Sequence, residues 1–271
     1  MYTIYRNIVI LKIVPIPGGT PMYKKYLWLV ALWMLCAVPG FAQLQKFCIP
    51  GIAPTHHVTS MELSPATTVI DNKGGVSIDT LTAKMYYAFN PDYNVGVEVP
   101  FSRYEAPGDS HNGLGDVLLS AQAVQHSEYF DFGVKLDSYL PTANDDSLGT
   151  GKWQLAPAVF AVYPVNPNFF VAAGYKQTFS VAGDGSRDHI NYGRVRVLFS
   201  YMSDAQWWIT FDPQYYINYK HAHEAELVWE SELGVMVNPG TALYIKPGAH
   251  WGGNWRSRDW TLNMGFKILY L

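Results

Sequence analysis

The sequence predicts an all-β protein, a closed antiparallel transmembrane β-barrel of about 12 strands formed by residues 43–271. Three observations favour this class. Apolar and polar residues alternate with a period of two, short turns alternate with longer polar loops, and the chain is 15% aromatic but only 15% charged. Ordinary globular domains carry about 25% charged residues. Past residue 43 there is no apolar run of about 20 residues, which excludes a bundle of membrane-spanning helices.

The alternation is clearest at the carboxyl end, from Trp260 to Tyr270, where Trp, Leu, Met, Phe, Ile and Tyr occupy one face. Thr, Asn, Gly and Lys occupy the other face, as in a strand with different surroundings on its two sides. The same division recurs within residues 94–102, 131–137, 193–201 and 207–218. A first strand is expected between His57 and Ile70, where the alternation is weaker.

Turns and loops alternate between these strands. Short turns are predicted at 90–92, 126–128, 166–168, 203–205 and 238–240, all of them built from turn-forming residues. Longer loops are predicted at 105–113, 142–152, 182–189, 220–225 and 252–259. A first hairpin is expected near 71–75. An even number of strands returns both ends of the barrel to the short-turn side, which we expect to be periplasmic.

Residues 1–42 are interpreted as an N-terminal extension followed by a signal peptide. A signal peptide has a basic region, an apolar run and two small residues before the cleavage site. These are, in order, Lys24 and Lys25, Leu27–Val38, and Gly40 with Ala42. Cleavage is expected before Gln43, and Met22 is the expected start. A membrane anchor is the alternative, disfavoured because the apolar run is short.

Ionisable side chains recur on the strand faces opposite the apolar faces. The predicted lumen-lining residues are Lys84, Glu98, Asp131, Lys135, Asp137, Lys176, Arg194, Arg196, Asp212, Glu230, Glu232, Lys246 and Lys267. Each buried charge costs several kcal/mol unless it is paired, so these groups do not fit the dry interior of a soluble barrel or sandwich. A hydrated lumen accommodates them, with the apolar faces toward lipid.

Aromatic residues near the strand ends complete this pattern. Outer-membrane barrels carry aromatic girdles at both membrane interfaces. The predicted girdle residues are Tyr87, Phe89, Trp153, Tyr163, Phe169, Tyr201, Trp207, Trp251, Trp260 and Tyr270.

Two stretches carry a family resemblance, NGLGDVLLS at 112–120 and LPTANDDSLGTGKWQLAPAVFAVY at 140–163. They resemble the outer-membrane transporter family of the MetA pathway of phenol degradation, and the sequence departs from the usual glycine-rich loop at 144–146. The resemblance implies a transporter-like barrel that passes hydrophobic or aromatic compounds. Its motif residues are Gly113, Gly115 and Asp116. From their chemistry alone, the glycines permit close backbone approach and Asp116 can accept hydrogen bonds, which favours a structural role.

The last strand also resembles the terminal signal read by the outer-membrane assembly machinery, through Asn263, Gly265, Ile268 and Tyr270. It departs by one additional residue, Leu271. The expected partners are therefore outer-membrane lipid, a small-molecule solute and the assembly machinery, in the outer membrane of a Gram-negative bacterium. A net charge of −3 and the lack of a basic run argue against nucleic acid.

Three functions remain open: a porin-like channel or transporter, a structural or adhesive barrel with a plugged lumen, and an outer-membrane lipid hydrolase. About 12 strands leave a narrow interior, and a mixed lining can close it by ion pairing. No catalytic residue is assigned, because the histidines lack a convincing serine partner. The protein is not expected to be an enzyme.

No cofactor or metal is expected. His221 and His223, with Glu224, could bind zinc or copper on one strand face, but a hydrated loop is the preferred interpretation. The two cysteines, Cys36 and Cys48, provide no disulfide framework, since Cys36 belongs to the segment expected to be cleaved.

Overall fold

The computed structural model describes residues 54–71, 74–220 and 224–270. The predicted extension, signal peptide, start at Met22 and cleavage site lie outside the described residues, as do His221 and His223. No described helix is long and apolar enough to cross a bilayer.

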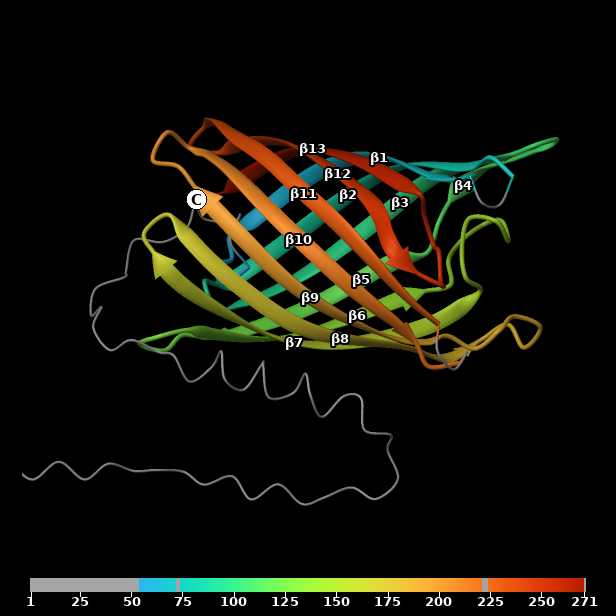
Figure 1. Cartoon of the computed structure of the whole chain (residues 1–271), viewed down its shortest axis with the longest axis horizontal. Helices are drawn as coiled ribbons and strands as arrows, with labels where there is room; N and C mark the ends of the chain where they lie inside the picture. The colour runs from blue at the N-terminus through green and yellow to red at the C-terminus, as the bar shows by residue number, and fades with distance from the viewer. Residues whose placement is uncertain (1–53, 72–73, 221–223, 271) are drawn as a thin grey trace, which may run out of the picture. The chain divides into compact units, whose positions relative to one another are not determined.

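Thirteen strands are assigned in the described part of the chain (Figure 1). They are β1 (Thr59–Ile70), β2 (Val76–Asn90), β3 (Tyr93–Ala106), β4 (Asp109–Leu114), β5 (Val117–Gln125), β6 (Asp131–Leu140), β7 (Lys152–Asn166), β8 (Phe169–Gly183), β9 (Asn191–Met202), β10 (Trp207–Asn218), β11 (Glu224–Asn238), β12 (Thr241–Gly253) and β13 (Trp260–Tyr270).

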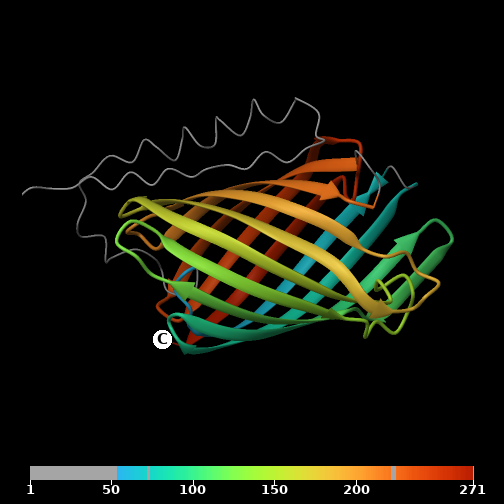
Figure 2. The same ribbon diagram turned by 90° about the horizontal axis from the view of Figure 1, so that it is seen from below.

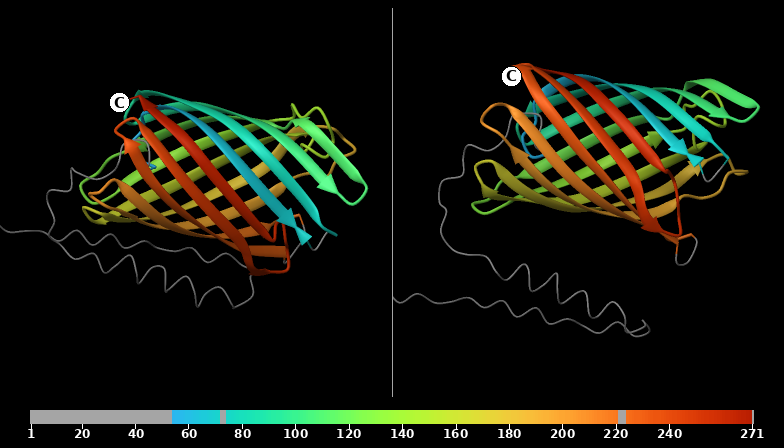
Figure 3. Two further views of the ribbon diagram at one scale, coloured as in Figure 1. Left: turned by 90° about the horizontal axis from the view of Figure 1, so that it is seen from above. Right: turned by 45° about the horizontal axis from the view of Figure 1, so that its top comes forward.

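The strands form one closed antiparallel barrel. Strand β1 pairs with β2 on one side and with β13 on the other, which joins the first and last strands of the sheet. Strands β4 and β5 both pair with β3, so they are two segments of one crossing, and the barrel has 12 strands as predicted. The strands tilt steeply against the barrel axis (Figures 2 and 3). Among the described strands only β4 is paired on one side alone, and closure pairs all the others on both sides, as a membrane interior requires.

The predicted loop at 105–113 is wrong, because these residues extend a hairpin. Strand β3 continues to Ala106 and β4 begins at Asp109, with Glu105 paired to Ser110. Gly108 lies in the turn at φ 80°, a conformation that glycine adopts without strain. Polar side chains here resemble a loop in sequence because both faces of the hairpin are polar. In Figure 1 the hairpin extends beyond the neighbouring strands.

The outward rows of the barrel are apolar. Leu63, Val134 and Val159 are 50%, 55% and 56% exposed, although side chains of this kind are normally buried in soluble proteins. Their neighbours along each strand point inward: Ser60, Glu62 and Ser64 alternate with Met61 and Leu63 on β1. The predicted girdle aromatics follow the outward rows, with all but the partly buried Phe169 exposed. An apolar exterior of this extent requires lipid around it.

Inside the barrel, large aromatic side chains lie over glycines of the neighbouring strand. Trp208 is paired with Gly234, and a Cβ added to Gly234 would lie 2.0 Å from the indole. The same arrangement is found for Tyr86 over Gly96, Phe160 over Gly133 and Tyr244 over Gly265. The missing Cβ makes room for each ring against the wall, which lets a narrow barrel hold bulky inward side chains.

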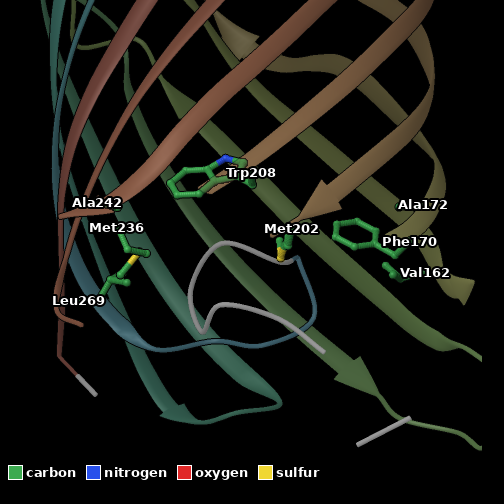
Figure 4. Packing of buried hydrophobic residues seen from close by; sticks show 8 residues of the cluster. All are labelled: Val162, Phe170, Ala172, Met202, Trp208, Met236, Ala242 and Leu269. Atoms are coloured by element: carbon green, nitrogen blue, oxygen red, sulfur yellow. The ribbon is translucent and has the colours of Figure 1, made fainter. Parts of the chain in front are cut away.

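An apolar collar lines the inside of the barrel at the short-turn end (Figure 4). Its members are Val162, Phe170, Ala172, Met202, Trp208, Met236, Ala242 and Leu269. Val58, just before β1, packs against this collar. The interior therefore changes from apolar at the short-turn end to charged farther along the barrel.

Candidate functional site: the barrel lumen

The predicted lumen-lining residues lie on the inward rows of the strands. Of the thirteen, twelve form a charged belt across the middle of the lumen. They are Lys84, Glu98, Lys135, Asp137, Lys176, Arg194, Arg196, Asp212, Glu230, Glu232, Lys246 and Lys267. Asp131 instead lies at the short-turn end, where its Oδ1 is 2.8 Å from Nδ1 of His126.

Ion pairs between side chains of different strands hold most of the belt. Lys84 Nζ lies 2.7 Å from Glu62 Oε1, and Lys176 donates to Asp137. Asp137 has only 2% of its side chain exposed, so it depends on Lys176 and on Lys135, whose Nζ lies 3.1 Å from its Oδ1. Arg196 binds Asp212 through Nε at 2.8 Å and Nη2 at 2.6 Å, which is a bidentate contact.

On the wall formed by β11 and β12 the pairing is looser. Lys246 Nζ lies 3.8 Å from one carboxylate oxygen each of Glu230 and Glu232. Arg258, from the loop after β12, lies 3.5 Å from the other oxygen of Glu230. Glu98 accepts a hydrogen bond from Tyr86. Glu98 therefore relies on a neutral partner, Tyr86, and Glu230 relies partly on a loop residue, Arg258.

An aromatic cluster occupies the lumen toward the loop end. Tyr192, Tyr216 and Trp255 have ring centroids 5.9 to 6.2 Å apart, with Trp255 contributed by the loop after β12. This loop is fastened inside the barrel, since Ser257 donates from its backbone and its hydroxyl to the fully buried Glu226. The loop therefore narrows the lumen.

The segment Pro54–His57 lies inside the short-turn end. Gln122 Nε2 donates to the Pro54 carbonyl oxygen at 2.8 Å, and His57 Nδ1 lies 3.1 Å from Asn94 Nδ2. Asn94 and Gln122 are inward residues of β3 and β5, so the wall of the barrel holds this segment through two side-chain hydrogen bonds.

Two cavities meet at Pro54. One, of about 220 Å³, is lined by residues of both the belt and the collar, including Asp212, Lys246 and Phe170. The other, of about 210 Å³, includes Lys176 and Phe160. Both are bounded by Arg196 and Leu198. Both cavities thus lie where charged and apolar linings meet.

His57 provides the pH dependence of this segment. Burial, with His56 beside it, lowers the pKa of His57 from 6.5 to about 4. Neutral His57 can accept from Asn94, whereas protonation of Nδ1 removes that acceptor. Because the pKa is lowered in the folded state, the stability that this group contributes is present above pH 6.5. It is lost as the pH falls from 6.5 toward 4.

We therefore expect the His57 ring to titrate near pH 4 in the folded protein. Histidine-labelled protein in micelles, followed by NMR from pH 8 to 3.5, measures this directly. Asn94→Ala should move the titration toward 6.5, because His57 becomes less tightly held. An unshifted titration at 6.5 in the wild type would mean that His57 is solvated.

The motif residues Gly113, Gly115 and Asp116 lie where β4 passes into β5. Asp116 accepts hydrogen bonds from the Thr150 backbone (2.7 Å), the Thr150 hydroxyl (2.8 Å) and the Ala143 backbone (3.3 Å). A Cβ on Gly113 would lie 2.1 Å from the Asn144 amide oxygen, and Gly115 donates to the Pro100 carbonyl oxygen at 2.9 Å. The motif thereby holds the loop at 141–151 against the barrel wall.

Asp116→Ala is expected to release this loop. The substitution removes the acceptor for three donors, and hydrogen bonds to a charged group contribute about 1.5–3 kcal/mol each. Proteinase K should then cleave within 141–151 at least tenfold faster, as measured by mass spectrometry. The heat-modifiable migration that marks a folded barrel should persist. Equal cleavage rates in variant and wild type would contradict an anchoring role.

Two of the described histidines, His126 and His250, make no hydrogen bond to a serine hydroxyl, whereas Nδ1 of His189 lies 3.4 Å from Oγ of Ser180. His126 lies between Asp92 and Asp131, and the hydroxyl of the adjacent Ser127 donates to the Phe130 carbonyl oxygen. Elsewhere, Ser257 donates to Glu226 rather than to His250. A nucleophile needs its hydroxyl against a base, and neither pair has that arrangement.

Within residues 54–71, 74–220 and 224–270, no group of three His, Cys, Asp or Glu residues is arranged to hold a metal ion. Glu224, the described member of the candidate cluster, accepts from Asn218 Nδ2 at 2.9 Å.

Several lumenal residues were missed in the sequence. Glu62 lies within a weakly alternating stretch, though the polar set Ser60, Glu62 and Ser64 could have identified it. Trp255 and Arg258 lie in a loop, where side-chain direction does not alternate regularly and cannot be inferred from the sequence. Pro54 precedes the first strand, and nothing local in the sequence indicates that it lies inside the barrel.

Three solved structures of bacterial outer-membrane channels and porins share this fold. The COG4313 outer membrane channel from Pseudomonas putida F1 aligns with a TM-score of 0.66 and 12% identity, over 86% of this chain and 100% of that chain. The KdgM porin aligns at 0.56 and 11% identity over 78% and 99% of the two chains. For the NanC porin the values are 0.55, 11%, 79% and 100%.

No family model matches the sequence, and no curated protein matches it. The structural likeness establishes the fold. Together with the apolar outer rows, it makes this protein an outer-membrane β-barrel.

Proposed function

We propose that the protein is an outer-membrane channel for small hydrophobic or aromatic compounds. The observation that supports this most directly is the position of the two cavities, between the charged belt and the apolar collar. A barrel with a purely structural role has no need of space at this boundary. The fold shared with solved outer-membrane channels supports the same class of function.

The two linings favour a particular kind of solute. A strongly hydrated solute with no apolar part loses hydrogen bonds on entering an apolar collar and gains no apolar contact there, at a cost of several kcal/mol for a small ion. An apolar or aromatic solute gains from contact with Phe160, Phe170 and Leu198. The resemblance carried by residues 112–163 points to the same compounds. In this proposal, lipid covers the outer rows, a small solute occupies the lumen, and the assembly machinery reads strand β13.

Uptake by intact Gram-negative cells tests the proposal, because a lipopolysaccharide leaflet slows the passage of apolar solutes. Cells that make the barrel should accumulate labelled phenol faster than cells with an empty vector. Accumulation of a small sugar should change less. Heat-modifiable migration of the extracted protein controls for folding.

A barrel with a plugged lumen is the second candidate, favoured by Pro54–His57 inside the short-turn end and by the ion pairs of the belt. It predicts no gain in phenol uptake and no conductance in planar bilayers from correctly folded protein. That pair of results would overturn the channel.

A further inference from the structure

The charges of the belt are segregated around the lumen. Strands β6 to β9 form a basic wall, with Lys135, Lys176, Arg194 and Arg196 against the single carboxylate Asp137. The remaining arc, from β10 around to β3, is richer in carboxylates: Asp212, Glu230, Glu232, Glu62 and Glu98 against Lys246, Lys267 and Lys84. A field therefore crosses the lumen and draws anionic groups toward the basic wall.

Arg194 is the cation of the basic wall that lacks a carboxylate. It is paired directly with Lys176 on β8, and Arg196 follows two residues later on the same face. Like charges directly opposite each other on neighbouring strands are destabilising. Asp137 compensates Lys176, and Asp212 compensates Arg196. One positive charge of this trio is left over.

The partners of Arg194 are neutral. Its Nη1 lies 3.3 Å from Gln214 Oε1 and 3.4 Å from the Tyr216 hydroxyl, and its guanidinium carbon lies 5.8 Å from the centre of the Tyr216 ring. Among the residues that the structure describes, no carboxylate oxygen lies within 4.0 Å of its nitrogens. Five N–H donors on a planar fork suit a carboxylate, so the group has unused capacity.

This guanidinium lines the cavity of about 210 Å³, and so does an apolar surface. The other charged residues of the lining are Lys135, Lys176, Arg196 and the carboxylate Asp137, which Lys135 and Lys176 neutralise. Phe160, Ala172 and Leu198 supply apolar contact. A cavity with a cationic fork on one side and apolar side chains on the other fits an amphipathic anion.

We propose that this cavity binds a small organic carboxylate with an apolar body, with benzoate as the simplest probe. The carboxylate pairs with Arg194 and the body packs against Phe160 and Leu198. The inference rests on the proposed channel and specifies its solute, so that a compound entering the lumen is held by its acid group. A neutral aromatic compound would lack the ion pair, and acetate would lack the apolar contact.

Equilibrium binding to the folded barrel in micelles tests this without requiring transport. Calorimetric titrations with benzoate, acetate and benzyl alcohol compare the full ligand with the carboxylate alone, in acetate, and with the aromatic ring alone, in benzyl alcohol. Benzoate should bind at least tenfold more tightly than either. Arg194→Gln should weaken benzoate binding at least tenfold and leave the affinity for benzyl alcohol unchanged. The benzoate affinity of Arg194→Lys should lie between those of the wild type and of Arg194→Gln, because lysine keeps the charge but lacks the planar guanidinium.

Lys84→Gln is the matched control, since it removes the same charge from the opposite wall. It should keep the preference for benzoate over benzyl alcohol. Heat-modifiable migration establishes that each variant is folded. Equal affinity of wild type and Arg194→Gln for benzoate would overturn the inference, as would equal affinity of the wild type for benzoate and benzyl alcohol. Benzoate binding without any uptake or conductance would retain this site and overturn the channel.

Discussion

Val159→Arg should destabilise the barrel by about 2–4 kcal/mol, the cost of an arginine on the lipid face at the bilayer midplane. Val159 lies in the middle of β7, points outward and is 56% exposed. In water such a substitution would be nearly neutral, since surface changes usually stay within about 0.5 kcal/mol. Reversible urea unfolding in lipid vesicles, followed by tryptophan fluorescence, measures the difference.

Asn166→Arg is the control on the same strand. Asn166 is exposed at the short-turn end of β7, where the cost of a charge falls to about 0–1 kcal/mol. If Val159→Arg loses much more unfolding free energy than Asn166→Arg, the cost depends on the depth of the residue in the membrane and is not a general effect of arginine on β7. Equal effects would contradict the orientation of the outward rows.

The double variant Asn94→Ala and Gln122→Ala should increase single-channel conductance. These side chains make the two side-chain hydrogen bonds to His57 and Pro54, in addition to the backbone hydrogen bond from His57 to the Pro91 carbonyl oxygen at 3.2 Å. Neutral hydrogen bonds contribute about 1 kcal/mol each, so losing two shifts the ratio of released to seated segment about 30-fold. Planar-bilayer recordings should show larger or more frequent open events than the wild type.

Gln154→Ala is the matched control for this experiment. Gln154 is a buried inward amide of β7 that bonds to Thr150 at 2.9 Å and makes no contact with Pro54–His57. Its loss should leave the open events unchanged. If the double variant also behaves as the wild type, the segment does not limit conductance.

The barrel could be predicted from the sequence because the polarity of each strand residue indicates whether its side chain faces lipid or the lumen. On β10, Trp207, Ile209 and Phe211 alternate with Thr210 and Asp212, and the lipid and the lumen select opposite chemistry at each step. The short turns could also be predicted, because the backbone preferences of turn-forming residues act locally.

What remained outside prediction is set by contacts between distant segments. Trp255, from the loop after β12, packs on Tyr192 and Tyr216 inside the lumen, and Pro54 accepts a hydrogen bond from Gln122 of β5. The β3–β4 hairpin has polar side chains on both faces, so its sequence shows no alternation of apolar and polar residues from which strands could be predicted. The spare charge of Arg194 became visible only when the partners of Lys176 and Arg196 were known.

Site-directed spin labelling along β6 tests the orientation of the barrel wall most directly. Labels at Val134→Cys and Leu136→Cys should collide with oxygen dissolved in lipid, and a label at Lys135→Cys should collide with a water-soluble nickel complex instead. This alternation is predicted because β6 has lipid on one face and the charged lumen on the other. Greater access of the nickel complex to 134 and 136 than to 135 would contradict it, and with it the membrane barrel.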